Sequence, residues 1–548
     1  MLKFPASGQG FKTIRKHNLL YVDKTKIINE MVSTEGCYFL SRPRRFGKTL
    51  LLGTIAALFE GDKKLFDGLW IASDAVRYDF KKYPVLTITM PSDTDNKKLL
   101  NKGIMDELRA AAEKYDLNDV DGPTPAITLK KIVRALVKKT NEKVVVLIDE
   151  YDEPIRSQIH NIPQALKNRD ALHSFFYSLK TLADKEMLHF LLVTGVTKFS
   201  KASIFSGFNN LNDITMNPAY HSICGFTLEE FDTYFENYLP DILEYNKSNN
   251  FLPSNFTVDN LKDKIIEYYD GYSWDGKRKI INPYTLIKFI ENKEFQDFWF
   301  DSGTPTFLLK YIAQRPHELT SPTSNTLTSS MLNAVEINRL NLTSLLFQTG
   351  YLTITGRVDA NNYTLDFPNH EVSSAFNSQL FQYLTDQKNI DTMNELSSQI
   401  KSALVNFDSN ELANCFSKIL TWVTYAEQPK RESYHHAIIC AVLRALSFNI
   451  TSQFVTSEDV CDIKIEMGPK LIFVGEFKYE KFENHPENEI EQRRQELFNK
   501  AIALGEAQIK KKRYAKGLRT EGVTVKCLAV AIVGKTDVAV KIFDPPLD

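Results

Sequence analysis

The stretch Ser41-Arg-Pro-Arg-Arg-Phe-Gly-Lys-Thr-Leu50 decides the fold of the N-terminal part of this 548-residue chain. It follows an apolar run, Cys37 to Leu40, and precedes the apolar, helix-compatible segment Leu50–Phe59. A strand, a loop ending in Gly-Lys-Thr and a helix, in that order, form a phosphate-binding loop (P-loop), where backbone N–H groups and a helix N-terminus hold phosphates. We therefore predict that ATP binds at this loop.

The loop carries residue types that suit this chemistry. Lys48 is expected to pair with the β- and γ-phosphates, and the Thr49 hydroxyl is expected to coordinate Mg²⁺. The consensus G-x-x-x-x-G-K-[ST] begins with a glycine, where this chain has Arg42. Because Gly-Lys-Thr also occurs by chance, a basic turn before a helix is the alternative. The other residues that we expect to contact the nucleotide are Arg42, Arg45, Phe46 and Gly47.

The composition is that of a globular multidomain protein. Hydrophobic residues make up 43% and charged residues 25% of the chain, and its length predicts about three or four domains. The formal net charge of −1 means that any nucleic-acid site must be a local patch. The six cysteines form no CxxC pair, which is typical of a reduced, cytoplasmic protein without structural zinc. We see no signal peptide and no apolar run of about 18 residues, so no membrane partner is expected.

A second stretch, Lys143-Val-Val-Val-Leu-Ile-Asp-Glu-Tyr-Asp152, supports the nucleotide site. Its consecutive aliphatic residues predict a strand that is buried on both faces, as in a parallel sheet. Two carboxylates follow at the end of this strand, where open α/β sheets bind ligands. Asp149 is predicted to hold Mg²⁺, and Glu150 to activate the water that attacks the γ-phosphate. A strand that merely runs into an acidic loop is the alternative.

Further strands and helices alternate along the first part of the chain. Tyr83–Met90 and Leu188–Lys198 predict strands, and residues 127–139 carry apolar residues at helical spacing. The second of these strands ends in Thr194 and Thr197, which either sense the γ-phosphate or serve as ordinary strand-end caps. This alternation predicts a doubly wound α/β domain.

Two segments flank the predicted P-loop domain. Asn18–Thr25, ahead of the loop, is either a structural lead-in strand or a cover for the nucleotide base. After the domain, Phe226–Glu236 predicts a helix that is opened by Thr227, with Glu230 three residues later in a capping box. We interpret residues 216–300 as a small helical lid on the ATPase core.

A β-hairpin is predicted between Val460 and Lys478, because an alternating segment and a strongly apolar run flank a turn. With the turn centred between Gly468 and Pro469, Asp462 would lie opposite residue 475. This position is next to Glu476, so the carboxylates of Asp462 and Glu476 could converge at the open end of the hairpin.

The charged residues of this hairpin suit metal-assisted hydrolysis of a phosphodiester. Period-two geometry places Glu476 and Lys478 on one face. Asp462 and Glu476 are predicted to hold Mg²⁺ beside the scissile phosphate, while Lys478 positions or activates the water. Half-exposed hairpins also carry such charges on their solvent face, which is the alternative. The basic run Lys510–Arg513 either contacts a phosphate backbone or is a solvated helix face.

Taken together, these motifs resemble those of a bacterial family of AAA-ATPase-like proteins with a C-terminal PD-(D/E)xK nuclease-like domain. The order of the motifs matches over most of the chain, and the family's arginine-rich loop lacks the first glycine. Asp462, Glu476 and Lys478 match the nuclease motif, and Gln508 and Tyr514 resemble its Gln-to-Tyr helix. The remaining matching stretches are Tyr21-Val-Asp-Lys-Thr25, Thr194-Gly-Val-Thr-Lys-Phe-Ser200, Ser203-Ile-Phe-Ser-Gly-Phe-Asn-Asn-Leu-Asn-Asp213 and Cys224-Gly-Phe-Thr227.

The resulting prediction is an α/β multidomain protein. The expected parts are an AAA-ATPase-like P-loop domain with a doubly wound parallel sheet (1–215), a helical lid (216–300), a connecting or winged-helix-like module (301–390) and an α/β PD-(D/E)xK nuclease-like domain (391–548). We expect an ATPase coupled to a Mg²⁺-dependent nuclease that acts on nucleic acid, with DNA favoured over RNA.

The alternative function is a nucleotide-dependent switch or interaction protein whose nuclease-like domain is inactive. It is favoured by the near-neutral charge and by Asp459-Val460, which stands where the family often has Gly-Arg. The sequence leaves two further points open. One is the formation of a homo-oligomer, and the other is whether Arg44, Arg45 or Arg156 serves as an arginine finger.

Overall fold

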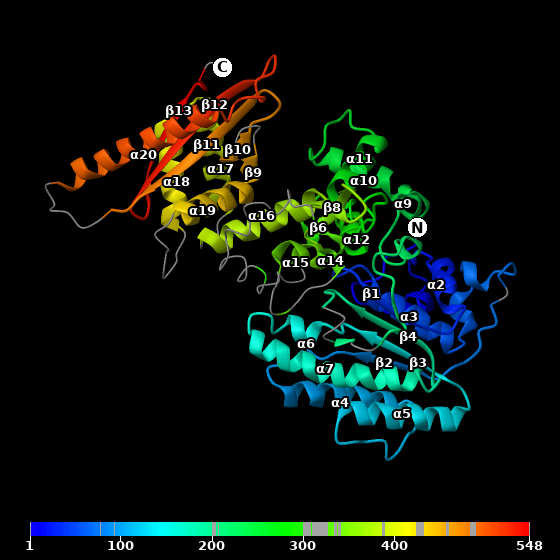
Figure 1. The fold of residues 1–548 in the computed structure, drawn as a ribbon. Coiled ribbons are helices and arrows are strands. Elements are labelled where there is room, and N and C mark those ends of the chain that lie inside the picture. Colours follow the sequence, from blue (N-terminus) through cyan, green and yellow to red (C-terminus); the bar gives the residue numbers. More distant parts are fainter. Residues whose placement is uncertain are drawn as a thin grey trace. The chain divides into compact units, whose positions relative to one another are not determined.

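The computed structural model describes residues 2–76, 78–92, 94–199, 204–205, 208–299, 308, 327–333, 337, 341–385, 390–422, 432–455, 460–482 and 489–546. The chain divides into two compact units (Figure 1). Unit 1 comprises Met1–Asp301 and Asn325–Val372, and unit 2 comprises Ser302–Ser324 and Ser373–Asp548. The predicted lid therefore belongs to the same compact unit as the predicted P-loop domain, whereas the predicted module 301–390 is divided between the two units.

The central sheet of unit 1 has five parallel strands in the order β2-β3-β4-β1-β5. The strands are β1 (Gly36–Ser41), β2 (Val85–Thr89), β3 (Val144–Asp149), β4 (Leu188–Gly195) and β5 (Leu211–Asp213). Every residue of β3 is buried, as its consecutive aliphatic residues predict. The predicted parallel α/β sheet is therefore confirmed.

Helices cover both faces of this sheet (Figure 1). Along the sheet, the connection from β1 to β2 runs in one direction, and the connections from β2 to β3 and from β3 to β4 run in the other. Because such crossovers are right-handed, the helices of the two directions lie on opposite faces of the sheet. One face is covered by α3 (Lys48–Phe59), with α1 (Phe11–Lys16) packed against it. The other carries α4 (Lys97–Glu113), α5 (Pro125–Thr140) and α7 (Ile162–Ala183). The short helices α2 (Thr25–Val32), η1 (Lys63–Phe66), η2 (Trp70–Ala72) and α6 (Glu153–Arg156) complete this part.

The helices after the sheet pack on the N-terminal segment. They are η3 (Pro218–Tyr220), α9 (Leu228–Phe235), η4 (Glu236–Tyr238), α10 (Leu239–Ser248), α11 (Val258–Tyr269) and α12 (Pro283–Asn292). The predicted capping box opens α9, because Thr227 and Glu230 each accept the other's backbone N–H. Leu20 and Val22 are part of the apolar core of these helices. The segment before the P-loop is therefore anchored on the lid helices.

The last part of unit 1 is a small antiparallel sheet with the strand order β6-β8-β7. Its elements are β6 (Leu327–Thr328), α14 (Ser329–Asn333), α15 (Leu342–Thr349), β7 (Thr353–Arg357) and β8 (Asn362–Asp366). All residues of α15 are buried. The winged-helix-like character of residues 301–390 stays a prediction. Most of residues 301–340 lies outside the described part of the chain.

Unit 2 contains a second five-stranded sheet, in the order β13-β12-β11-β10-β9. Only β11 and β12 pair in parallel, and α20 packs against both. The strands are β9 (Asn449–Val455), β10 (Val460–Glu466), β11 (Leu471–Glu480), β12 (Thr524–Val533) and β13 (Asp537–Phe543). The helices are α16 (His370–Thr385), which spans the division between the units, α17 (Ile390–Val405), α18 (Ser409–Trp422), α19 (Glu432–Ala445) and α20 (Ile490–Lys512).

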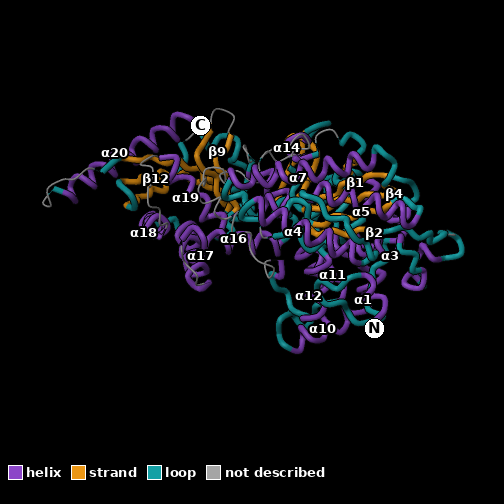
Figure 2. The backbone as a smooth tube through the Cα atoms, turned by 90° about the horizontal axis from the view of Figure 1, so that it is seen from below, coloured by secondary structure: helices purple, strands orange, loops and turns teal. Residues whose placement is uncertain are grey.

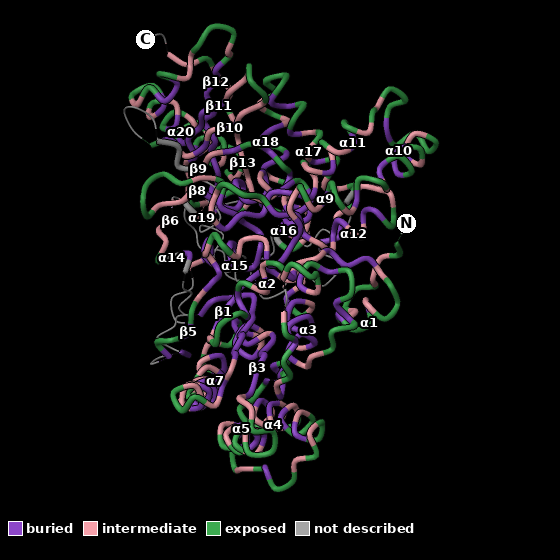
Figure 3. Tube along the Cα trace, turned by 90° about the vertical axis from the view of Figure 1, so that its right-hand side faces the viewer, coloured by how far each residue is buried: buried purple, intermediate pink, exposed green. Residues whose placement is uncertain are grey.

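The central strands of both sheets are the buried centres of their units. Figure 2 shows that each group of strands is accompanied by helices, and in Figure 3 the strands β3 and β12 are largely buried while α4 and α5 carry many exposed residues. In a parallel sheet the carboxyl ends of all strands lie at one edge, where ligands bind in α/β folds.

The β10–β11 hairpin corrects the predicted register by one residue. Ile463 pairs with Gly475, so the turn is centred on Pro469 rather than between Gly468 and Pro469. Gly468, the first residue of the loop, has a φ of +79°, which glycine adopts without the steric cost of a Cβ. The observed pairing brings Asp462 one position closer to Glu476 than predicted.

Candidate active sites

The P-loop connects β1 to α3 at the carboxyl edge of the sheet. Gly47 precedes α3 with a φ of +90°, which glycine adopts without the steric cost of a Cβ. The first N–H groups of α3 have no partner within the helix and are directed toward the loop. Lys48 is buried, and its Nζ donates to the carbonyls of Arg42 at 2.9 Å and Pro43 at 2.8 Å. Burial lowers the pKa of Lys48, and the nearby Asp149 opposes this shift.

Three of the predicted site residues are joined by hydrogen bonds. The Thr49 hydroxyl donates to Oδ2 of Asp149 at 2.6 Å, and the Thr194 hydroxyl donates to Oδ1 at 2.6 Å. These side chains come from α3, from the end of β3 and from the end of the neighbouring β4. The structure therefore brings them together at the P-loop, while their roles toward Mg²⁺ and the γ-phosphate stay predictions.

Glu150 is half-buried and has an uncommon backbone conformation. Its φ is +53°, and its N–H donates to Oδ1 of Asp149 at 3.0 Å. A left-handed conformation costs a non-glycine residue about 1 kcal/mol or more, so the surroundings must hold it in place. Such a constraint fixes the direction in which the carboxylate leaves the backbone.

Arg42, which replaces the first glycine of the loop, binds protein groups through its guanidinium. It is 1% exposed, and its Nη1 donates to the carbonyls of Ser41 at 2.9 Å and Thr215 at 2.8 Å. Its guanidinium carbon lies 3.9 Å from the ring centroid of Trp274. Burial lowers the pKa of Arg42 to about 10. The side chain thus ties the loop to the segment after β5 and to the lid, and contact with a nucleotide stays a prediction.

Arg45 and Phe46 also attach the loop to the lid. The Arg45 guanidinium carbon lies 3.6 Å from the ring centroid of Tyr284, which is a cation–π contact. The buried Phe46 ring meets the rings of Tyr272 and Trp274 edge to face, with centroids 4.8 Å and 5.6 Å away. These aromatic partners fix the loop conformation, and they were not singled out by sequence reasoning.

An apolar pocket adjoins the end of the P-loop. It encloses about 570 Å³, including the open solvent at its mouth, and is lined by the segment Leu20–Lys24, the start of α3 and residues 223–226. Phe46 and Gly47 also form part of its wall. Small-molecule sites have a predominantly apolar lining of this kind. The pocket therefore offers an apolar surface next to the phosphate-binding N-terminus of α3.

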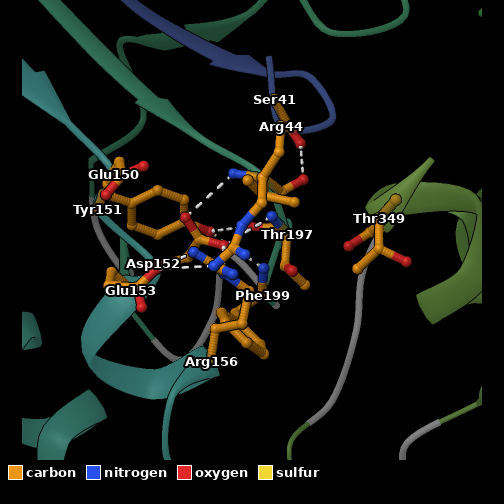
Figure 4. A network of polar contacts seen from close by, with 12 residues as sticks. Ser41, Arg44, Glu150, Tyr151, Asp152, Glu153, Arg156, Thr197, Phe199 and Thr349 are labelled. Atoms are coloured by element: carbon orange, nitrogen blue, oxygen red, sulfur yellow. Dashed lines mark hydrogen bonds and ion pairs between the residues drawn. The ribbon is translucent and has the colours of Figure 1, made fainter. Parts of the chain in front are cut away.

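A buried network joins the loop after β3 to the loop after β4 (Figure 4). The fully buried Asp152 accepts from the N–H groups of Val196 at 3.0 Å and Thr197 at 2.7 Å. The Tyr151 hydroxyl donates to the Thr197 carbonyl at 2.9 Å and accepts from the Phe199 N–H at 3.1 Å. The sequence motif that contains Tyr151 and Asp152 did not predict their contacts with the loop after β4.

Arg156 balances the charge of this network. Its Nε lies 3.4 Å from Oδ2 of Asp152, and its Nη2 forms an ion pair with Glu153. Arg44 of the P-loop lies 3.9 Å from the same Glu153 carboxylate. Arg156 is only 3% exposed and is held by carboxylates of its own chain. It is therefore not placed to act as an arginine finger on another subunit.

In unit 2 the predicted residues surround the β10–β11 pair. Oδ2 of Asp462 accepts from the Phe477 N–H at 2.9 Å, just beyond the last paired residues of the ladder. Lys478 Nζ donates to Oε1 of Glu476 at 3.0 Å, so these two side chains share a face as predicted. Gln508 of α20 donates to the same oxygen. The structure thus groups the residues that the resemblance to nucleases indicates, and their catalytic roles stay predictions.

Glu476 is the buried member of this group. Burial, followed by the negative charge of Asp462, raises the pKa of Glu476 to about 7. Its Oε2 is buried and has no hydrogen-bond partner among the described residues. An oxygen of this kind suits a cation, and carboxylate is the ligand type that Mg²⁺ prefers. Across the described ranges, however, no group of three or more His, Cys, Asp and Glu side chains is arranged to hold a metal ion.

The raised pKa of Glu476 predicts a pH-dependent stability of the metal-free protein. Between the usual glutamate pKa, about 4.5, and about 7 the folded state keeps a proton that the unfolded state releases. The free energy of unfolding of unit 2 should therefore fall as the pH rises through this window. Glu476→Gln should abolish this component, as measured by urea denaturation with EDTA at pH 5 and pH 7.5. An identical pH dependence in both proteins would contradict the burial argument.

Some predicted positions fall outside the described part of the chain. This group contains Ser200, Ser203 and residues 206–207 of the two motif stretches after β4, and Asp459. Within the described residues, the helices offer no segment with the length and apolar character needed to span a bilayer.

The parallel sheet, the Gly47 loop at the start of α3 and the Thr49–Asp149 contact define a P-loop NTPase. A family model described as "AAA-ATPase_like: Predicted AAA-ATPase" matches residues 5–205. The chain is also 30% identical over 487 residues to an "Uncharacterized protein in vnfD 5'region" of Azotobacter chroococcum mcd 1, covering 87% of this chain and 89% of that protein. The chain belongs to the same family as this Azotobacter protein, and its residues 5–205 match the AAA-ATPase-like family model.

A solved structure, that of the Aeropyrum pernix ORC1 protein in complex with DNA, aligns with a TM-score of 0.23 at 9% identity. The alignment covers 65% of this chain and 92% of that chain. A likeness of this size carries no argument about fold or partner. The family match ends at residue 205 and does not extend to unit 2.

Proposed function

We propose that the protein hydrolyses ATP in unit 1 and cleaves nucleic acid in unit 2. The hydrogen-bonded group Thr49–Asp149–Thr194 at the P-loop is the observation that carries the first activity. Family membership adds to it, because AAA-ATPase-like proteins are expected to bind nucleotides. The second activity rests on Asp462, Glu476 and Lys478.

In the proposed ATP complex, Lys48 exchanges the carbonyls of Arg42 and Pro43 for the β- and γ-phosphates. The start of α3 supplies backbone N–H groups to the phosphates, and the adjoining apolar pocket receives the base. The hydroxyl of Thr49 and the carboxylate of Asp149 are oxygen donors that fit Mg²⁺.

Hydrolysis then depends on residues at the ends of β3 and β4. We assign Glu150 as the base that takes a proton from the attacking water, since it follows Asp149 directly and has a fixed backbone direction. Thr194 is proposed to contact the γ-phosphate from the neighbouring strand. Mg²⁺, when bound, would neutralise charge on the phosphate oxygens.

Replacing Lys48 by Ala should weaken ATP binding and lower turnover by at least about 100-fold, because a phosphate-directed charge is lost. Equilibrium binding of a fluorescent ATP analogue and phosphate release measure the two effects. Lys102→Ala removes an exposed lysine and serves as the matched control. Wild-type binding and turnover in the Lys48 variant would overturn the assignment of the P-loop.

For unit 2, we propose Mg²⁺-dependent phosphodiester hydrolysis with DNA as the preferred substrate. Asp462 and Glu476 would hold the metal ion together. The atom of Glu476 that suits this role is its buried Oε2, which has no hydrogen-bond partner among the described residues. Lys478 would position the attacking water beside the scissile phosphate. The exposed basic residues at the end of α20, Lys510, Lys511 and Arg513, provide charge for the phosphate backbone.

Incubation of the purified protein with Mg²⁺ and either plasmid or single-stranded DNA tests this activity. Cleavage that EDTA abolishes supports the proposal. ATP hydrolysis without any cleavage would favour the alternative, in which ATP operates a switch and unit 2 is an inactive interaction domain.

A further inference from the structure

The chain has to hold Glu150 in a conformation that is unfavourable for it. Its φ of +53° is left-handed, and glycine alone adopts such angles without steric cost. The residue before it, Asp149, is fixed by Thr49 and Thr194. The residues after it must therefore supply the second anchor.

This second anchor is formed by Tyr151 and Asp152. The Tyr151 N–H donates to the Thr194 carbonyl at 3.0 Å, and its hydroxyl binds backbone groups of Thr197 and Phe199. Asp152 accepts two consecutive backbone N–H groups directly after β4. Glu150 thus lies between two attachments that both lead to the end of β4.

The contact with β4 is too close for any side chain on Gly195. A Cβ at this position would lie 2.5 Å from the Tyr151 ring and 2.6 Å from Oδ1 of Asp152. Gly195 is also tied to the loop after β1, because the Arg42 N–H donates to the Gly195 carbonyl at 3.1 Å. The loops after β1, β3 and β4 are therefore fastened together directly beside the proposed ATP site.

The charge of Asp152 is compensated inside this assembly. A fully buried carboxylate is costly unless it is paired and hydrogen-bonded. Asp152 has two N–H donors and the buried Arg156, whose own pKa is lowered by burial. Breaking such a pair would leave one buried charge uncompensated, so both members should be needed to keep the loop geometry.

We propose that Asp152 and Arg156 are a positioning pair that sets Glu150 and Thr194 for the hydrolytic step, without contacting the nucleotide. The proposal rests on the proposed ATPase function and deepens it by separating nucleotide binding from hydrolysis. The pair acts through the backbone of residues 149–152 and 194–197, since Asp152 accepts from the N–H groups after β4 and Arg156 holds the Asp152 carboxylate.

Asp152→Asn tests the pair because the amide keeps the size but has only one acceptor oxygen and no charge. We expect kcat for ATP to fall about 10- to 100-fold, the cost of a small misplacement of catalytic groups. The dissociation constant of ATP should change by no more than about twofold, since only the hydrolytic geometry is affected. Arg156→Gln should behave in the same way, and Arg156→Lys should recover most of the lost turnover.

Two further variants make the test specific. Tyr151→Phe removes only the hydroxyl that binds Thr197 and Phe199, so it should also lower kcat at unchanged ATP affinity. It takes the place of Asp152→Asn if that variant does not fold. Asp106→Asn, which breaks the exposed Asp106–Arg109 ion pair, is the control and should leave kcat unchanged.

The outcomes separate this inference from the proposed function. If the wild-type protein does not turn over ATP, the proposed function itself is wrong. Wild-type turnover that persists in Asp152→Asn and Tyr151→Phe would overturn the positioning pair alone. A loss of ATP affinity with kcat retained at saturation would also overturn it, because the pair would then serve binding rather than hydrolysis.

Discussion

Replacing Glu150 by Gln is expected to lower ATP turnover by at least about 100-fold, the usual contribution of a positioned base. Gln has nearly the same shape and tolerates the left-handed backbone no worse than Glu, so the loop after β3 should keep its conformation. The amide cannot accept a proton from the attacking water. ATP should still bind, because Lys48, Thr49 and the start of α3 are unchanged.

Phosphate release and equilibrium ATP binding, measured on the same preparation, distinguish this outcome from simple unfolding. Glu142→Gln, which neutralises an acid paired with Lys81 outside the site, is the matched control. A Glu150 variant that binds and hydrolyses ATP like the wild type would remove Glu150 from the mechanism.

The second large effect is expected in unit 2. Glu476→Gln and Asp462→Asn should each reduce Mg²⁺-dependent DNA cleavage to the background without enzyme, because each removes one of two proposed metal ligands. Glu476→Gln also removes a buried acid whose pKa is raised to about 7, so it should not destabilise the fold at neutral pH.

Glu466→Gln is the control for these variants, since Glu466 is a carboxylate on the same hairpin that binds Lys464 and Asn449 instead. Cleavage should be unaffected by this substitution, as followed by plasmid relaxation on a gel. Cleavage that persists in both the Glu476 and Asp462 variants would have to arise elsewhere.

The sequence predicted the elements of unit 1 well where one physical signal was dominant. Val144–Ile148 are consecutive aliphatic residues, and a run of this length rich in β-branched side chains favours a strand buried on both faces. Such a strand fixes where Asp149 and Glu150 emerge. The parallel sheet and the neighbourhood of Thr49, Asp149 and Thr194 followed from this.

The hairpin register could not be obtained in the same way. Gly468-Pro469 suits both a two-residue and a three-residue turn, and the choice depends on how β10 pairs with β9 and β11. Period two nevertheless placed Glu476 and Lys478 on one face correctly. Relations within a strand were thus predictable, while the alignment between strands was off by one residue.

Contacts between distant residues were beyond the sequence. Arg42 looked like an anomaly in a phosphate-binding loop, and only the folded chain shows its guanidinium on Thr215 and Trp274. Asp152 looked like one more acid in an acidic stretch. Its role became visible through its contacts with the segment after β4, more than 40 residues away.

The most direct measurement is a crystal structure of the full chain with Mg²⁺ and a non-hydrolysable ATP analogue. We expect the phosphates at the start of α3, with Lys48 Nζ moved from the carbonyls of Arg42 and Pro43 onto them. We also expect one Mg²⁺ beside Thr49 and Asp149. A nucleotide bound elsewhere, with Lys48 still on those two carbonyls, would contradict the account.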